Sequence, residues 1–174
     1  NMMSKAVDKF SKIDVLVNNA ALYGALKSSR FEDIDPNQWD KAMNVNVKGL
    51  WNCCRAISPI MRENKSGSII NIASLAAKFG MPYAADYATS KAAVIHLTKQ
   101  QAVELGEHEI RVNCVAPGPV RTKLAAAVHT QEIVDAYHDA IPLNRYGTEE
   151  EIGQVIYFLC SDKASYLTGQ IIAV

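Results

Sequence analysis

Four short runs rich in isoleucine and valine recur along the chain, separated by longer segments with helix-type patterns. The runs lie at 12–17, 67–73, 110–116 and 170–174. They are almost continuously apolar, as is typical of strands that are covered on both faces of a sheet. Strands that alternate with helices form βαβ units with right-handed crossovers. The alternation therefore predicts an α/β fold built on a parallel sheet with flanking helices.

Helix signals fill the intervals between these runs. Asp35 and Pro36 match an N-cap and a first helical residue, and Gln38 stands at the position of a capping partner. A long helix is therefore expected over 36–62, and another over about 86–106. Two further helices are predicted over about 130–140 and from Thr148, which forms a capping-box pattern with Glu151.

Composition narrows the class of protein. The 174 residues suit a single domain with a sizeable core, so 1–174 is read as one domain. Eighteen Lys and Arg balance eighteen Asp and Glu, which gives no indication of a nucleic acid or membrane partner. The four cysteines are Cys53, Cys54, Cys114 and Cys160. They form no CxxC pair, so we expect no metal site and free thiols in a cytoplasmic protein.

Small and polar residues follow the predicted strands. Asn18 and Asn19 come after the first strand, Ser74 after the second, and the segment 117–122 (PGPVRT) after the third. In parallel sheets of this kind, ligands bind beyond the carboxyl ends of the strands. The functional site is therefore expected along this edge.

Tyr87 and Lys91 lie one helical turn apart in the segment YATSK. The pair could be an ordinary surface pair. A cation within about 4–6 Å of a phenol also lowers the phenol's pKa, and such a tyrosine can exchange a proton with an alcohol or carbonyl oxygen. Ser74 could bind the same oxygen, or it could be a simple turn serine. Interconversion of an alcohol and a ketone would in addition require a hydride carrier, because no side chain supplies one.

Asn46 lies between Met43 and Leu50 on the apolar side of the first long helix. A buried side-chain amide needs hydrogen-bond partners. It is either a structural amide satisfied by the backbone or an amide that holds a water or a neighbouring group in a site.

Five motifs together resemble the short-chain dehydrogenase/reductase family. They are DVLVNNA, the asparagine of MNVNVKG, NIAS, YATSK and RVNCVAPGPVRT, and they occur in the family's order and spacing over nearly the whole chain. The resemblance implies a Rossmann-like, doubly wound parallel sheet with flanking helices. It also implies an NAD(P)-dependent oxidoreductase that interconverts a secondary alcohol and a ketone.

The resemblance assigns roles to individual residues. Tyr87 would be the general acid or base, Lys91 would lower the pKa of Tyr87 and hold the nicotinamide ribose, and Ser74 would orient the substrate oxygen. Asn46 would hold a water that links Lys91 to solvent. The remaining cofactor-binding positions would be Asn18, Asn19, Ala20, Pro117, Gly118, Val120 and Thr122.

The family's Gly-rich phosphate loop has no counterpart in the sequence, and alanine stands at position 21 where glycine is usual. The chain is therefore read as the C-terminal two-thirds of such an enzyme, without its N-terminal strands. The strand at 13–17 would then be an open sheet edge. Whether the cofactor is NAD or NADP cannot be read, because the residues that select it would precede Asn1.

Two alternatives remain open beside the dehydrogenase. One is a non-catalytic fragment or interaction module, and the other is an epimerase or dehydratase that uses the same Tyr and Lys. The substrate is expected to be a small molecule, and the resemblance implies a homodimer or homotetramer built on the two long helices. The pocket walls are expected at 75–86 and 123–146, and they include residues that could equally be packing residues: Leu75, Phe79, Met81, Tyr83, Leu124 and Tyr137.

Overall fold

A parallel four-stranded sheet forms the centre of the computed structural model, which describes residues 2–174. The strands lie in the order β1 (Val15–Asn18), β2 (Gly67–Ile72), β3 (Ile110–Ala116) and β4 (Ile171–Ala173). All three neighbouring pairs are parallel. The predicted α/β fold is confirmed, and each strand overlaps the run that predicted it.

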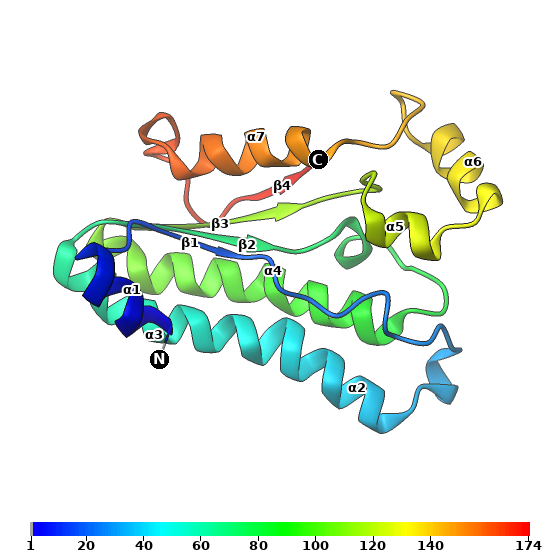
Figure 1. Ribbon diagram of the computed structural model, residues 1–174, viewed down its shortest axis with the longest axis horizontal. Helices are drawn as coiled ribbons and strands as arrows, with labels where there is room; N and C mark the ends of the chain where they lie inside the picture. The colour runs from blue at the N-terminus through cyan, green and yellow to red at the C-terminus, as the bar shows by residue number, and fades with distance from the viewer. Residues whose placement is uncertain (1) are drawn as a thin grey trace.

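Helices cover both faces of the sheet (Figure 1). On one face lie α2 (Pro36–Met43), α3 (Leu50–Asn64) and α4 (Ala85–Leu105), and on the other lies α7 (Glu149–Cys160). Two short helices, α5 (Lys123–Val128) and α6 (Gln131–Ala140), stand beyond the carboxyl ends of the strands. The remaining elements are α1 (Met2–Phe10) and the short helical turns η1 (Phe31–Asp33), η3 (Leu75–Ala77), η4 (Gly106–His108) and η5 (Asp162–Ala164).

Each face of the sheet has its own hydrophobic core. Ile57 of α3 and Val94 of α4 are fully buried against Ile69 of β2. On the opposite face, Leu159 of α7 is fully buried against Ile70, the next residue of β2. Successive residues of a strand point to opposite faces, so a strand that is covered on both faces is mainly apolar. This explains why the strands were visible as continuous apolar runs.

The helix predicted over 36–62 contains a π-helical turn, η2 (Asn44–Gly49), between α2 and α3. Such turns add one residue to the helical repeat and are frequent at functional sites. The buried side chain of this turn is Asn46. The turn therefore changes which residues face the sheet within an otherwise continuous helix.

Helix capping agrees with the sequence pattern at two helices and departs from it at one residue. Asp35 caps α2 by accepting from the Asn37 amide at 2.9 Å, and Thr148 and Glu151 form the predicted capping box. The role predicted for Gln38 as capping partner is wrong. Its side chain instead bonds the backbone of Lys27 in both directions, at 3.0 Å each, because the loop that follows β1 packs alongside α2.

The strand β1 forms one edge of the sheet within the described residues, as predicted. Val15 and Val17 on this strand remain exposed. Across residues 2–174, no helix combines the length and apolarity that crossing a membrane requires.

Candidate active site

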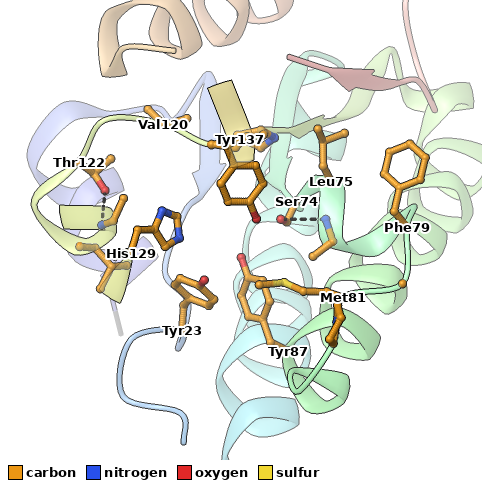
Figure 2. Close-up of a pocket in the computed structure, with 18 residues that line it drawn as sticks. Tyr23, Ser74, Leu75, Phe79, Met81, Tyr87, Val120, Thr122, His129 and Tyr137 are labelled. Atoms are coloured by element: carbon orange, nitrogen blue, oxygen red, sulfur yellow. Dashed lines mark hydrogen bonds between the residues drawn. The ribbon is translucent and has the colours of Figure 1, made fainter. Parts of the chain in front are cut away.

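Two neighbouring cavities lie at the carboxyl ends of the strands. The sheet-side cavity, of 550 Å³, lies between the strand ends and α7 and includes Ile72, Lys91 and Ile152 in its lining. The loop-side cavity, of 420 Å³, lies under α5 and α6 and includes Leu75 and Tyr137 (Figure 2). Both volumes suit small organic ligands. Both cavities therefore lie at the edge of the sheet where the sequence predicted a functional site.

Ser74 and Tyr87 line both cavities. Ser74 follows the end of β2 and caps the turn η3, because its hydroxyl accepts from the Ala76 amide at 3.2 Å. Tyr87 comes from the first turn of α4, and its hydroxyl points toward Ser74 (Figure 2). The two hydroxyl-bearing residues thus lie at the boundary between the two spaces.

Lys91 follows Tyr87 by one turn of α4 and lines the sheet-side cavity. Its ammonium lies 5.8 Å from the centre of the Tyr87 ring and donates to the Ile72 carbonyl at 2.8 Å. Burial lowers the pKa of Lys91 to about 8, with nearby Cys114 acting in the opposite direction. Lys91 is therefore a buried cation anchored on the end of β2.

The predicted role of Lys91 in lowering the pKa of Tyr87 stays a prediction, because the net change of that pKa in the structure is upward. Burial raises the pKa of Tyr87, hydrogen bonding with Ser74 opposes that change, and Tyr23 adds to it. The physical reason is that removal from water disfavours the phenolate, while the ammonium is directed at a backbone carbonyl. The phenol is therefore the stable form at neutral pH.

Asn46 joins the loop after β1 to helix α4. Its amide accepts from the Leu22 backbone N–H at 2.6 Å and donates to the Leu22 carbonyl and the Ser90 hydroxyl at 3.1 and 2.9 Å. Ser90 in turn donates to the Tyr87 carbonyl at 2.7 Å. The amide is satisfied largely by backbone, as the structural reading held, and its role in holding a water stays a prediction.

The predicted cofactor residues after β1 have different surroundings. Asn18 is buried, and its side chain donates to Asn71 at 2.9 Å and to the sulfur of Cys54 at 3.2 Å. It therefore ties β1 to β2, which agrees with a role in steadying the sheet. Asn19 lines the sheet-side cavity, whereas Ala20 lines neither of the two cavities.

The segment after β3 forms a wall shared by both cavities. Its lining residues are the four predicted from the sequence: Pro117, Gly118, Val120 and Thr122. Gly118 donates to the Val174 carbonyl at 2.7 Å, and a Cβ placed on it would lie 3.0 Å from Leu75. Thr122 caps α5 through the Ala125 amide at 3.0 Å. Glycine thus permits the close packing of this segment against the turn that follows Ser74.

Two residues near Tyr87 carry no sequence signal that singles them out. The ring of Tyr23 lies 4.7 Å from the ring of Tyr87, and Tyr23 lines both cavities. Asp86 is buried and accepts from the Tyr87 amide at 2.8 Å and from Gln38 at 2.9 Å. Asp86 therefore fixes the start of the helix that carries Tyr87. In the sequence, only its position directly before Tyr87 could have pointed to this role of Asp86.

A second network missed from the sequence runs beneath the site. Asn71 of β2 accepts from Asn18 and donates to Thr98 and Gln101 of α4, each at 3.0 Å. Asn71 has no exposed surface. The network connects β1, β2 and α4 and so fixes the strand ends relative to the helix that carries Tyr87 and Lys91.

No group of three or more metal-ligating side chains is brought together within residues 2–174. Most of the residues predicted as pocket walls line the loop-side cavity: Leu75, Phe79, Met81, Leu124 and Tyr137. The site can therefore offer hydroxyl groups and apolar walls to an organic ligand.

Known proteins resemble this chain over its full length. The family model described as enoyl-(acyl carrier protein) reductase matches residues 1–174. A 3-oxoacyl-[acyl-carrier-protein] reductase, FabG, of Thermotoga maritima is 41% identical over 99% of this chain and 69% of its own length. A 3alpha-hydroxysteroid dehydrogenase of Mediterraneibacter gnavus is 40% identical over 99% of this chain and 68% of its own length.

Solved structures agree with these matches. A 7alpha-hydroxysteroid dehydrogenase complexed with NADH and 7-oxo glycochenodeoxycholic acid superposes with a TM-score of 0.94, at 36% identity over 99% of this chain and 66% of that one. The protein ElxO with NADP bound superposes with a TM-score of 0.91, at 32% identity over 99% and 70%. The chain therefore belongs to the short-chain dehydrogenase/reductase family of oxidoreductases, whose Rossmann-type doubly wound fold it shares.

Proposed function

We propose that the protein is an NAD(P)-dependent oxidoreductase that interconverts a secondary alcohol and a ketone, with Tyr87 as general acid and base. One observation carries the proposal: Ser74 and Tyr87 lie at the boundary of the sheet-side and loop-side cavities. A hydride transfer needs two ligands in contact, and a proton must reach the oxygen between them. The two side chains stand where that oxygen would be.

The sheet-side cavity fits the nicotinamide end of a dinucleotide. Its lining combines a buried cation, Lys91, with the amide of Asn19 and the wall that includes Val120 and Thr122. These residues would hold the ribose and the ring, and the bound cofactor supplies or accepts the hydride. Related structures contain NADP or NADH, so both dinucleotides are candidates.

In the direction of ketone reduction, Tyr87 donates its proton to the carbonyl oxygen. A phenol is protonated at neutral pH, and burial, which raises the pKa of Tyr87, favours that form further. Ser74 donates a hydrogen bond to the same oxygen. Lys91, 5.8 Å from the ring centre, stabilises the phenolate that remains after the transfer. In the direction of oxidation, the phenolate accepts the proton of the alcohol.

Fluorescence titration with NADH and, separately, NADPH tests the proposal. The folded chain is expected to bind at least one of them. Lys91→Met is expected to weaken that binding about tenfold or more, because it removes the cation from the cavity. Lys99→Met, an exposed position two turns further along α4, is the matched control and should bind as the wild type does. A folded chain that binds neither dinucleotide contradicts the proposal and favours an interaction module.

Assembly and location are further proposals. We propose a homodimer or homotetramer in the cytoplasm, with a small molecule as substrate. Size-exclusion chromatography with light scattering measures the assembly directly, and a monomer at working concentration contradicts it.

A further inference from the structure

We infer that the substrate is a neutral, apolar ketone or the corresponding alcohol, without a charged group next to the reacting carbon. This inference rests on the proposed function and names its substrate class. It follows from the chemistry of the loop-side cavity and of a third cavity that continues from it.

The loop-side cavity has no Asp, Glu, Lys or Arg among its lining residues, all of which the structure describes. Its polar side chains are hydroxyls and one imidazole. Of the hydroxyls, Thr122 is engaged in capping α5, and Ser74 and Tyr87 serve the reacting oxygen. The other two belong to the phenols Tyr23 and Tyr137. The rest of the wall is aliphatic or aromatic, and its large members include Leu75, Phe79, Met81 and Tyr137 (Figure 2), together with Leu124.

His129 is the imidazole in this wall, and its surroundings favour the neutral form. Burial lowers its pKa, and its Nδ1 lies 3.0 Å from the hydroxyl of buried Tyr146. Its ring also contacts the ring of Tyr137, at 5.7 Å between centres. His129 therefore packs within the aromatic wall, where its uncharged form is favoured.

The nearest buried cation, Lys91, does not face the loop-side cavity. Of the three cavities, Lys91 lines only the sheet-side cavity. Its ammonium already donates to the Ile72 carbonyl. A carboxylate attached to the reacting carbon would therefore be removed from water in the loop-side cavity without a counterion.

The apolar body of a ligand can continue toward α6. A third cavity of 660 Å³, the α6-side cavity, shares Met81, His129 and Tyr137 with the loop-side cavity, as well as both Tyr23 and Tyr87. Its charged lining residues are Lys27 and Asp86. Asp86 is already bonded to Gln38 and to the Tyr87 amide, which leaves Lys27 as the one charge a ligand could reach. A ligand charge is therefore compatible only with a group that reaches Lys27, which does not line the loop-side cavity.

Removing an ionised carboxylate from water without a partner is strongly unfavourable. The same apolar wall is favourable for a ring, because aromatic side chains offer large flat surfaces. The cavity should therefore separate two ketones that differ only in charge beside the carbonyl.

The test compares 2-acetylnaphthalene with 2-naphthylglyoxylate, which has the same ring and ketone but carries a carboxylate on the carbonyl. The ratio of their kcat/KM values, with whichever dinucleotide binds, is expected to be about 100-fold or more in favour of the neutral ketone. Equal kcat/KM values, or a preference for the keto acid, overturn the inference.

A charge placed in the wall should reverse this preference. Met81 lies in both the loop-side and the α6-side cavity, so Met81→Arg is expected to raise kcat/KM for the keto acid about tenfold or more. The matched control, Met81→Leu, keeps the volume without the charge and should leave the ratio near that of the wild type. Unchanged selectivity in Met81→Arg also overturns the inference.

Binding without cofactor separates this inference from the proposed function. Saturation-transfer NMR of the folded chain should show contact with 2-acetylnaphthalene and none with the keto acid. If neither dinucleotide binds, the proposed function fails and the NMR comparison still decides the class of ligand. Equal transfer to both compounds, or none to the neutral ketone, contradicts the inference by itself.

Discussion

Lys91→Met should change how stability depends on pH, because Lys91 is a buried cation with a lowered pKa. Its side chain is 4% exposed, and burial lowers its pKa from 10.5 to about 8. The unfolded chain therefore binds a proton at this residue between about pH 8 and pH 10.5, where the native chain does not. Stability contributed by Lys91 consequently rises with pH through that window.

The magnitude follows from the shift. The difference of 10.5 − 8, about 2.5 pKa units, corresponds to about 3 kcal/mol in total. Between about pH 7 and pH 9.5, roughly 2 kcal/mol of that amount should appear as a rise in the free energy of unfolding of the wild type. Lys91→Met lacks this rise. Buried thiols such as Cys54 and Cys114, with pKa values raised to about 11, contribute the opposite slope in both proteins, so the comparison of variant with wild type largely cancels them.

Urea unfolding followed by circular dichroism at several pH values, with reductant present, measures the effect. The difference in unfolding free energy between wild type and Lys91→Met is the quantity to plot against pH. Lys99→Met on the exposed side of α4 should run parallel to the wild type. Parallel profiles for Lys91→Met as well would refute the reasoning, since they would mean that Lys91 titrates normally in the folded chain.

Three other substitutions test packing and hydrogen bonding in the fold, each by urea unfolding. Gly67→Ala should lose about 1–3 kcal/mol, because its Cβ would lie 3.2 Å from the Cβ of buried Met61 and closer still to that residue's sulfur; Gly80→Ala, with open space around it, should stay within about 0.5 kcal/mol. Asn71→Ala should cost about 2–4 kcal/mol, since it leaves buried amide and hydroxyl partners unpaired; a loss below about 1 kcal/mol contradicts the network's importance. Thr148→Ala should cost about 1 kcal/mol through the lost capping box, and an unchanged midpoint contradicts that role.

The sheet and its helices could be predicted because their physical causes are local. Strands that are covered on both faces are mainly apolar, and the capping residues Asp35 and Thr148 mark helix starts by their own side-chain bonds. The carboxyl edge of the sheet then located Ser74 and the segment 117–122. These elements needed no knowledge of distant contacts.

The remaining features depend on contacts between distant segments. The π-helical turn at Asn46 accompanies hydrogen bonds to Leu22, which lies in a different part of the chain. Asn71 stands in an apolar run, and only the fold shows that its amide joins three elements. Tyr23 belongs to no motif and becomes noteworthy only because its ring lies beside Tyr87. The pKa of Tyr87 likewise depends on burial, which spacing alone does not reveal.

Turnover by Tyr87→Phe tests the central claim most directly. The phenol-to-phenyl change removes only the hydroxyl at the boundary of the two cavities. Reduced-cofactor oxidation by a neutral ketone, followed at 340 nm, should fall at least about 1000-fold, while dinucleotide affinity measured by fluorescence stays within about twofold. That result would establish Tyr87 as the proton donor. Near-normal turnover by Tyr87→Phe, with the ketone and cofactor still bound, would contradict the account.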